Sequence, residues 1–231
     1  NFFFHNYLFE NIQMFKCYNR PMLLLHKKNL SLFLIFFFAL ESFTEEDPYV
    51  FIDNNAQKMV QVLTLEADLF ETDRALYEQK IKDIFEPMID FKLVAASVMG
   101  KKYYLLASKE ERSEFVVIFK ESLLDTYAET LAQWGDSTIT TEFPDNKTNI
   151  YEKNVEVKQI LDTGSSKYPI SYKLRKNKNE KGWKIVNIII NGVNLGLTFR
   201  NQFQALADTH NENINLTLRY WVSDAGDAGI S

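Results

Sequence analysis

The stretch that decides the fold runs from Trp183 to Phe203 and reads WKIVNIIINGVNLGLTFRNQF. Residues 185–190 are β-branched apart from a single asparagine, so the run predicts a strand that is apolar on both faces. Gly192 then permits a turn, because glycine adopts backbone angles that other residues avoid. From about Arg200, apolar residues at helical spacing predict a helix. A strand, a turn and a helix in this order indicate an α+β core.

Several residues of this stretch match, in register, the signature of a known protein family. They are Trp183, Gly192, Val193, Leu195, Arg200, Gln202 and Phe203. On these residues the chain resembles the MlaC family, periplasmic phospholipid-binding proteins also called toluene-tolerance auxiliary proteins. Three positions depart from the family pattern: Asn187 replaces an aspartate, Asn191 a glutamate and Asn194 a serine. All three asparagines can form hydrogen bonds, but the first two replacements remove a charge.

The resemblance continues upstream and covers roughly residues 50–210. The family shows an Asp-Phe pair, a Leu-Gly pair, aromatic residues, a Ser-x-Glu segment and a long Phe-rich helix with Leu-x-x-x-Tyr. The corresponding residues here are Asp90-Phe91, Met99-Gly100, Tyr103, Ser108 to Arg112, Phe115, Phe119, Leu123 and Tyr127.

The first half of the domain predicts helices. Asp53-Asn54 is a capping pair that favours the start of the first helix, and Asp73 can cap a second. A third apolar stripe predicts a helix that ends at Gly100. The strongest amphipathic pattern begins after Ser108, carries acidic residues in its first turn and closes at Trp134-Gly135.

The second half predicts strands. Residues 138–143, 155–161 and 169–174 have strand patterns, and residues 162–166 form a turn ahead of the strand at Trp183. Consecutive strands joined by short turns pair in antiparallel fashion. We therefore expect an α+β fold, with helices packed over one face of a twisted antiparallel sheet. The resemblance to MlaC proteins implies an NTF2-like sheet plus a helical part that together enclose an apolar cavity.

Residues 22–42 are typical of a signal peptide. Lys27 and Lys28 precede an apolar run, residues 30–40, that is too short to span a bilayer comfortably. Small residues at its end favour cleavage near residues 41–43. A membrane anchor that is kept after export is the alternative interpretation.

This signal sets the expected domain organisation. Residues 1–21 are then an upstream segment that is not part of the native protein, because Met22 can be the true start. Residues 43–222 form one MlaC-like lipid-binding domain, and the small, acidic residues 223–231 form a disordered tail. The predicted location is the periplasm.

Composition excludes several classes of function. The formal net charge of −5 and the pI of about 5.4 argue against a nucleic-acid partner. Cys17, the one cysteine, precedes the signal, and His210 is the one histidine that follows it. The sequence has no HExxH motif, no cysteine pair, no Walker glycine loop and no dinucleotide fingerprint. We therefore predict a binding protein and not an enzyme, with no catalytic residue, cofactor or metal.

One motif keeps a catalytic alternative open. Residues 162–166 read Asp-Thr-Gly-Ser-Ser, which matches the active-site motif of aspartic proteases. That chemistry needs two carboxylates that share a proton, and the motif occurs once, so catalysis would require a homodimer. A hairpin turn is the other interpretation, because Asp, Gly and Ser are common turn residues.

The resemblance implies a function that the motifs alone do not define. MlaC proteins hold the acyl chains of a phospholipid in an apolar cavity, so apolar residues that point inward are candidates for the lining. These candidates are Val98, Tyr103, Phe115, Phe119, Leu123, Tyr127, Val157, Ile170, Tyr172, Ile188, Ile190, Val193 and Phe199. Residues of the same types also build solid cores, so the pattern alone does not separate lining from core.

The resemblance also implies partners. A protein of this family shuttles phospholipid between an outer-membrane lipoprotein complex and an inner-membrane ABC transporter with an MCE-domain subunit, which maintains outer-membrane lipid asymmetry. A binding protein for another apolar molecule, such as a hopanoid, is the first alternative. A dimeric aspartic protease is the second.

Overall fold

The computed structural model describes residues 46–132, 137–145, 151–176 and 182–223, which all belong to the unit of residues 44–231. The predicted upstream segment and signal peptide lie outside the described residues. The helices are α1 (Pro48–Leu65), α2 (Leu69–Thr72), α3 (Arg74–Phe85), the 3₁₀ helix η1 (Glu86–Met88), α4 (Phe91–Leu106), α5 (Lys109–Ala132), α6 (Leu195–Thr209) and α7 (Ile214–Tyr220). The strands are β1 (Thr138–Thr141), β2 (Asn154–Asp162), β3 (Lys167–Lys176), β4 (Trp183–Ile190) and β5 (Val193–Asn194).

The five strands form one sheet in the order β1-β2-β3-β4-β5, and every neighbouring pair is antiparallel. The predicted antiparallel meander is confirmed. The register of β3 and β4 shifts between Lys173 and Leu174, which pair with Asn187 and Ile185. Val186 has no partner on β3 and is therefore the extra residue of a β-bulge. Because of this extra residue, side chains that precede and follow Val186 can point to the same face of the sheet.

One face of the sheet is buried under helices, and the other is polar. On β3, Ile170 and Leu174 are buried, whereas Lys173 points to the other face and pairs with Glu156 at 2.7 Å. This alternation is expected of an antiparallel sheet that has one solvated face.

Capping residues define where the helices begin. The predicted start of the first helix at Asp53 is wrong: α1 begins at Pro48, and the Asp47 carboxylate accepts a hydrogen bond from the Tyr49 amide at 2.8 Å. Proline suits this position because its missing N–H would lack a partner there anyway. The predicted cap at Asp73 is confirmed, since its carboxylate accepts from the Leu76 amide at 3.1 Å.

Helix α5 begins with a reciprocal capping box. The Glu111 amide donates to Ser108 Oγ at 3.0 Å, and the Ser108 amide donates to Glu111 Oε2 at 2.8 Å. The predicted start after Ser108 is confirmed, and this pairing explains it, because two amide donors find acceptors at once. The predicted end at Trp134-Gly135 lies outside the described residues.

Gly100 breaks α4 but does not end it, contrary to the sequence-based prediction. Its backbone angles, φ 68° and ψ 166°, are accessible to glycine almost alone, and a second helical segment follows as far as Leu106. Arg200 Nε donates a hydrogen bond to the Ser97 carbonyl at 2.7 Å, next to the break. The arginine of the family signature thus joins α6 to α4 where the helix ladder is interrupted.

The link from β4 to α6 is short. Asn191 and Gly192 both have positive φ, 48° and 83°, and they connect β4 to β5 as an Asn-Gly hairpin turn. Asn194 then caps α6 by accepting from the Leu197 amide at 3.1 Å. The helix predicted from about Arg200 therefore begins at Leu195.

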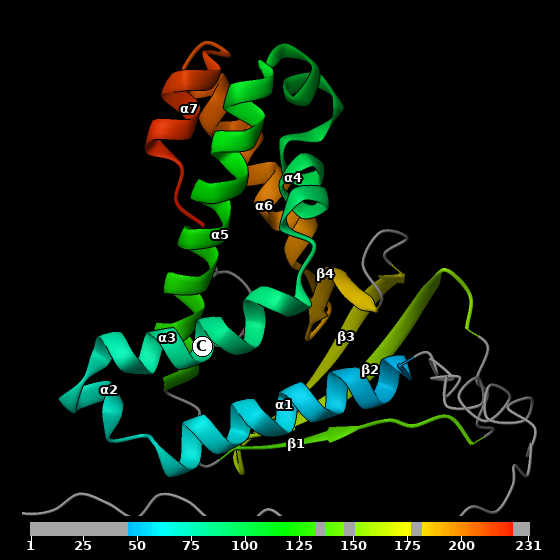
Figure 1. Cartoon of the computed structure of the whole chain (residues 1–231). Coiled ribbons are helices and arrows are strands. Elements are labelled where there is room, and N and C mark those ends of the chain that lie inside the picture. Colours follow the sequence, from blue (N-terminus) through cyan, green and yellow to red (C-terminus); the bar gives the residue numbers. More distant parts are fainter. Residues whose placement is uncertain (1–45, 133–136, 146–150, 177–181, 224–231) are drawn as a thin grey trace, which may run out of the picture. The chain divides into compact units, whose positions relative to one another are not determined.

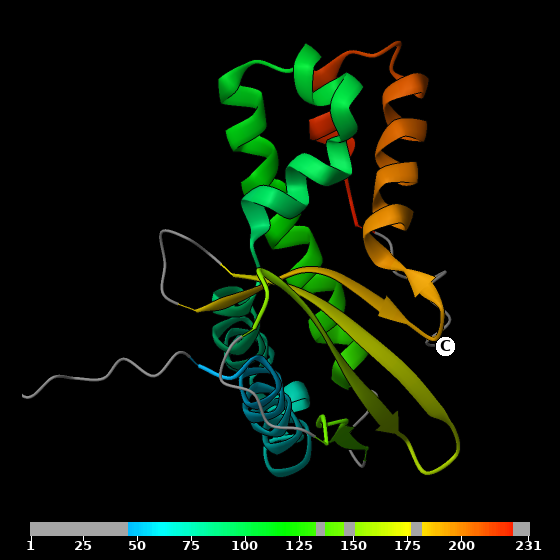
Figure 2. The same cartoon turned by 90° about the vertical axis from the view of Figure 1, so that its right-hand side faces the viewer.

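The helices form two groups (Figures 1 and 2). Helices α4, α5, α6 and α7 pack on one another as a bundle, whereas α1 lies along β1 and β2 and contacts α3. The long helix α5 belongs to both groups, since it also contacts α3. Among the described residues, no helix has the length and apolar character needed to cross a membrane.

An aromatic cluster fills the bundle. Phe115, Phe119, Phe203 and Trp221 are all buried, and the ring centroids of Phe115 and Phe203 lie 4.9 Å apart. Ser223, the first residue of the predicted disordered tail, is buried as well, and its amide donates to Ser122 Oγ at 2.6 Å. Residues 224–231 of that tail lie outside the described part of the chain.

Candidate functional site

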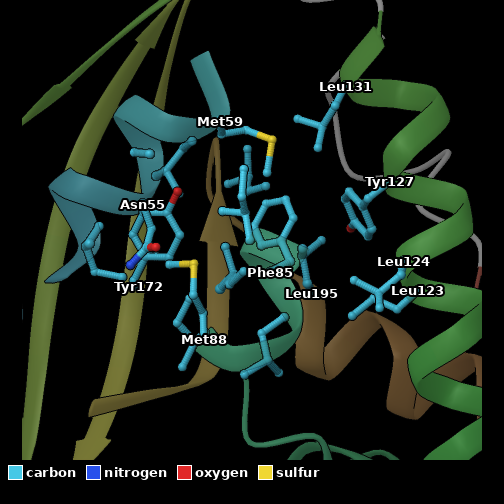
Figure 3. A pocket seen from close by; sticks show the side chains of 18 of the residues that line it. Asn55, Met59, Phe85, Met88, Leu123, Leu124, Tyr127, Leu131, Tyr172 and Leu195 are labelled. Carbon is cyan, nitrogen blue, oxygen red and sulfur yellow. The ribbon is translucent and has the colours of Figure 1, made fainter. Parts of the chain in front are cut away.

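An apolar pocket lies between the buried face of the sheet, helix α1, the end of α3, and the C-terminal half of α5 (Figure 3). Its unfilled space is about 1280 Å³, including the part that is open to solvent. Its walls are Ile52, Asn55, Ala56, Met59, Val60, Leu63, Ile84, Phe85, Met88, Ile89, Val94, Phe119, Leu123, Leu124, Tyr127, Leu131, Ser137, Ile139, Leu161, Ile170, Tyr172, Ile185, Asn187, Ile188, Ile190, Leu195, Gly196 and Phe199.

None of these lining residues carries a charge at neutral pH. The polar members are two asparagines, a serine and two tyrosines. The Asn55 amide group donates to the Phe51 carbonyl within α1 at 2.8 Å, so part of its polarity is used inside the helix. A pocket with this lining favours apolar ligand surface and penalises a buried, unpaired charge.

The two tyrosines are Tyr127 on α5 and Tyr172 on β3. Burial raises the pKa of both phenols well above the ordinary value of a tyrosine. Both hydroxyl groups therefore stay protonated and neutral at any physiological pH. The Tyr127 hydroxyl is fully buried and has no hydrogen-bond partner among the described residues.

Asn187 joins the sheet to helix α6 at one wall of the pocket. Its Oδ1 accepts from the Gly196 amide at 3.0 Å, and its Nδ2 donates to Asn194 Oδ1 at 2.9 Å. A Cβ at position 196 would lie only 2.6 Å from Asn187 Oδ1, which explains the glycine there. Two of the asparagines that depart from the family signature thus bond to each other.

Eight of the thirteen residues proposed from the sequence lie in the pocket wall. Phe119, Leu123 and Tyr127 come from α5, and the others from β3, β4 and α6. The full set is Phe119, Leu123, Tyr127, Ile170, Tyr172, Ile188, Ile190 and Phe199. The structure brings these residues together because α5, β3, β4 and α6 all contribute side chains to the space between α5 and the sheet.

The other five residues lie outside the wall of this pocket. Val98, Tyr103 and Phe115 belong to the bundle core, where α4 and the start of α5 pack against α6. Val157 is buried in a separate cluster with Trp183 and Leu174 under α1. Val193 lies in β5, outside the lining.

Sequence reasoning missed the wall contributed by α1, α3 and η1. Ile52, Met59 and Leu63 follow one another at spacings of seven and four, which is a helical stripe. This signal is present in the sequence, but it shows only that the helix has an apolar side. Which layer that side faces depends on the path of the chain between α1 and the sheet.

Residues 162–166 form the turn of the β2–β3 hairpin, which confirms the turn interpretation. The Gly164 amide donates to Asp162 Oδ1 at 2.9 Å, and this bond, with Lys167 beside it, lowers the pKa of the carboxyl group. Asp162 is not part of the pocket wall.

Replacing Asp162 with alanine is therefore expected to change stability only slightly and to leave ligand binding unchanged. The variant loses one solvent-accessible turn bond and one surface ion pair, which contribute little. Thermal unfolding and the amount of bound lipid check this prediction. Loss of a proteolytic activity in the variant would contradict it.

Nothing in the described residues supports a metal site or histidine-based catalysis. No group of three or more His, Cys, Asp or Glu side chains in them is placed to hold a metal ion. His210 caps the C-terminus of α6 and stacks on Tyr220, with ring centroids 5.1 Å apart.

The fold and the site define a small α+β protein built around an apolar ligand pocket. The sequence model of the MlaC protein family matches residues 53–221. The chain therefore belongs to the MlaC family.

Curated relatives and a solved structure agree with this assignment. The chain is 24% identical to the toluene tolerance protein ttg2D of Pseudomonas putida, over 85% of this chain and 90% of that protein. It is 23% identical to the intermembrane phospholipid transport system binding protein MlaC of Haemophilus influenzae, over 71% and 79% of the two chains. A phospholipid-binding protein from Ralstonia solanacearum, solved in complex with a phospholipid, has the same fold, with a TM-score of 0.66 at 21% identity. That match covers 76% of this chain and 94% of the other.

Proposed function

We propose that this protein is a periplasmic phospholipid carrier that holds the acyl chains of its ligand in the pocket. The observation that carries the proposal is an apolar pocket whose described lining residues carry no charge, in a fold that binds a phospholipid in the Ralstonia relative. The names of the curated relatives point to the same class of ligand.

The energetics of acyl chains suit a carrier that works between membranes. Burial of some thirty methylene groups at about 0.8 kcal/mol each favours the pocket over water by roughly 25 kcal/mol. A bilayer removes the same surface from water, so the membrane and the pocket compete on nearly equal terms. Release into water is strongly disfavoured, and transfer therefore requires contact with a membrane protein.

The partners that fit this role are an outer-membrane lipoprotein complex and an inner-membrane ABC transporter with an MCE-domain subunit. A relative is named as the binding protein of an intermembrane phospholipid transport system, which supports a role within such a system. The carrier itself needs no nucleotide, metal or catalytic residue for this role, because transfer changes no covalent bond.

Native mass spectrometry of the purified protein, followed by lipid extraction, tests the proposal. We expect phospholipid in close to one-to-one amount. Another apolar molecule in the extract, such as a hopanoid, would support the alternative ligand class. Protein that remains empty after exposure to phospholipid vesicles would contradict both.

We also predict that the signal peptide, which lies outside the described residues, is removed during export. We expect cleavage near residues 41–43, because the apolar run of residues 30–40 is short and follows Lys27 and Lys28. The mass of the chain recovered from the periplasmic fraction checks this. A chain found in the membrane fraction with residues 30–40 still attached would indicate a retained anchor.

A further inference from the structure

The Tyr127 hydroxyl can form hydrogen bonds, but none of the described residues bonds to it. Figure 3 shows the side chain projecting from α5 into the pocket, with Leu131 and Leu124 on the neighbouring turns. The hydroxyl oxygen is fully buried and has no partner among the described residues. Buried hydroxyl groups in proteins are nearly always hydrogen-bonded, so an orphan in a ligand pocket indicates a partner that the ligand supplies.

The residues of the pocket wall limit which ligand group can accept a hydrogen bond from Tyr127. Among the described residues, no lysine or arginine lines the pocket, so an anionic phosphate next to Tyr127 would be buried without a counter-charge from them. A neutral carbonyl oxygen avoids that penalty and still accepts a hydrogen bond. The phenol is protonated throughout the physiological range, because burial raises its pKa, and it therefore acts as the donor.

A phospholipid offers neutral acceptors of this kind where its acyl chains join the glycerol. Each ester linkage carries a carbonyl oxygen at the boundary between the apolar chains and the polar head group. A ligand carbonyl that reaches the Tyr127 hydroxyl would therefore satisfy a donor that is otherwise buried without a partner among the described residues.

We propose that the Tyr127 hydroxyl donates a hydrogen bond to an acyl-ester carbonyl of the bound lipid and thereby selects ester-linked over ether-linked phospholipid. This inference rests on the proposed function, since it assigns one contact within the same pocket. It gives α5 a polar contact to the ligand within a wall whose described residues carry no charge.

The test is a competition between two lipids that differ only at this carbonyl. The full chain is expressed and purified, then equilibrated with vesicles that contain equal amounts of diacyl and dialkyl phosphatidylcholine of the same chain length. The protein is re-isolated, and mass spectrometry gives its ratio of ester to ether lipid. All variants are equilibrated with the same vesicles, so a difference in their ester-to-ether ratios arises from the pocket and not from the membrane.

Tyr127→Phe is the informative variant, because it removes only the hydroxyl and keeps the ring. We expect its ester-to-ether ratio to fall about tenfold below that of the parent, which corresponds to about 1.4 kcal/mol. Its thermal midpoint should not fall, since the substitution removes an unsatisfied buried group.

Tyr77→Phe is the matched control. Tyr77 is also fully buried, and its hydroxyl has no partner in the described part of the chain, but it does not line the pocket, so this variant should keep the ratio of the parent. Tyr172→Phe tests the other tyrosine of the lining.

The possible results distinguish a failure of the ester contact from a failure of the carrier function. Equal ratios in the parent and in Tyr127→Phe, with lipid bound to both, would overturn the ester contact and leave the carrier function standing. A drop in Tyr172→Phe alone would place the contact on the sheet and also overturn it. A parent that takes up neither lipid would refute the carrier function, and the ester contact with it.

Discussion

Replacing Leu123 or Ile190 with tryptophan is expected to remove most of the phospholipid that co-purifies with the protein, while the fold survives. The two residues line the pocket from α5 and from β4. A larger side chain at either position can extend into the unfilled space instead of straining packed neighbours. It then occupies volume that acyl chain would otherwise fill. Phosphorus content per mole of protein and the thermal midpoint are measured together.

Val98→Trp is the control for this pair. Val98 is fully buried in the bundle core and does not line the pocket, so the added volume overpacks a solid region. We expect it to cost about 1–3 kcal/mol or more of unfolding free energy. If Leu123→Trp and Ile190→Trp lose stability to the same extent and their folded fraction keeps its lipid, the pocket does not hold the ligand at these positions.

Truncating Phe203 to alanine is expected to destabilise the protein strongly without emptying the pocket. The ring is fully buried, and its centroid lies 4.9 Å from that of Phe115 and 5.7 Å from that of Trp221. Removing a buried phenylalanine side chain from such a core costs about 3–5 kcal/mol, through lost burial and the cavity left behind. Denaturant unfolding measures this loss.

Lipid content provides the second measurement on the same variant. Phe203 is not a lining residue, so the protein that remains folded should carry as much phospholipid as the parent. Leu197→Ala on the same helix is the matched control, because Leu197 is 51% exposed and its truncation should change stability little. Loss of lipid from folded Phe203→Ala protein would mean that the bundle core and the pocket are one compartment.

Local patterns in the sequence were sufficient for most of the secondary structure. The strands of the meander and the caps at Asp73 and Ser108 follow from side-chain chemistry that acts over a few residues. The sequence pattern places the start of α1 too late, because Asp53 is a second plausible cap within the helix that Asp47 begins. Gly100 predicts a helix end because glycine commonly ends helices, yet Arg200 supports the chain across the break.

The site was harder to predict than the fold. Phe115 and Phe119 lie one turn apart on α5, but only Phe119 faces the pocket. Both are large, apolar and fully buried, so residue type cannot distinguish them. The difference arises because α4, α6 and α7 close around the first half of α5, whereas the second half stands off from the sheet. That separation depends on the whole arrangement of layers, which no local pattern encodes.

The bonds between Asn187, Asn194 and Gly196 have a consequence for the conditions under which the protein works. Amide groups neither gain nor lose a proton over the range that living cells tolerate, whereas an aspartate begins to protonate as the pH approaches about 4. The seam between β4 and α6 therefore keeps the same strength in acidic and neutral surroundings. We therefore expect the wall of the pocket that Asn187, Asn194 and Gly196 hold together to have the same geometry at mildly acidic and at neutral pH.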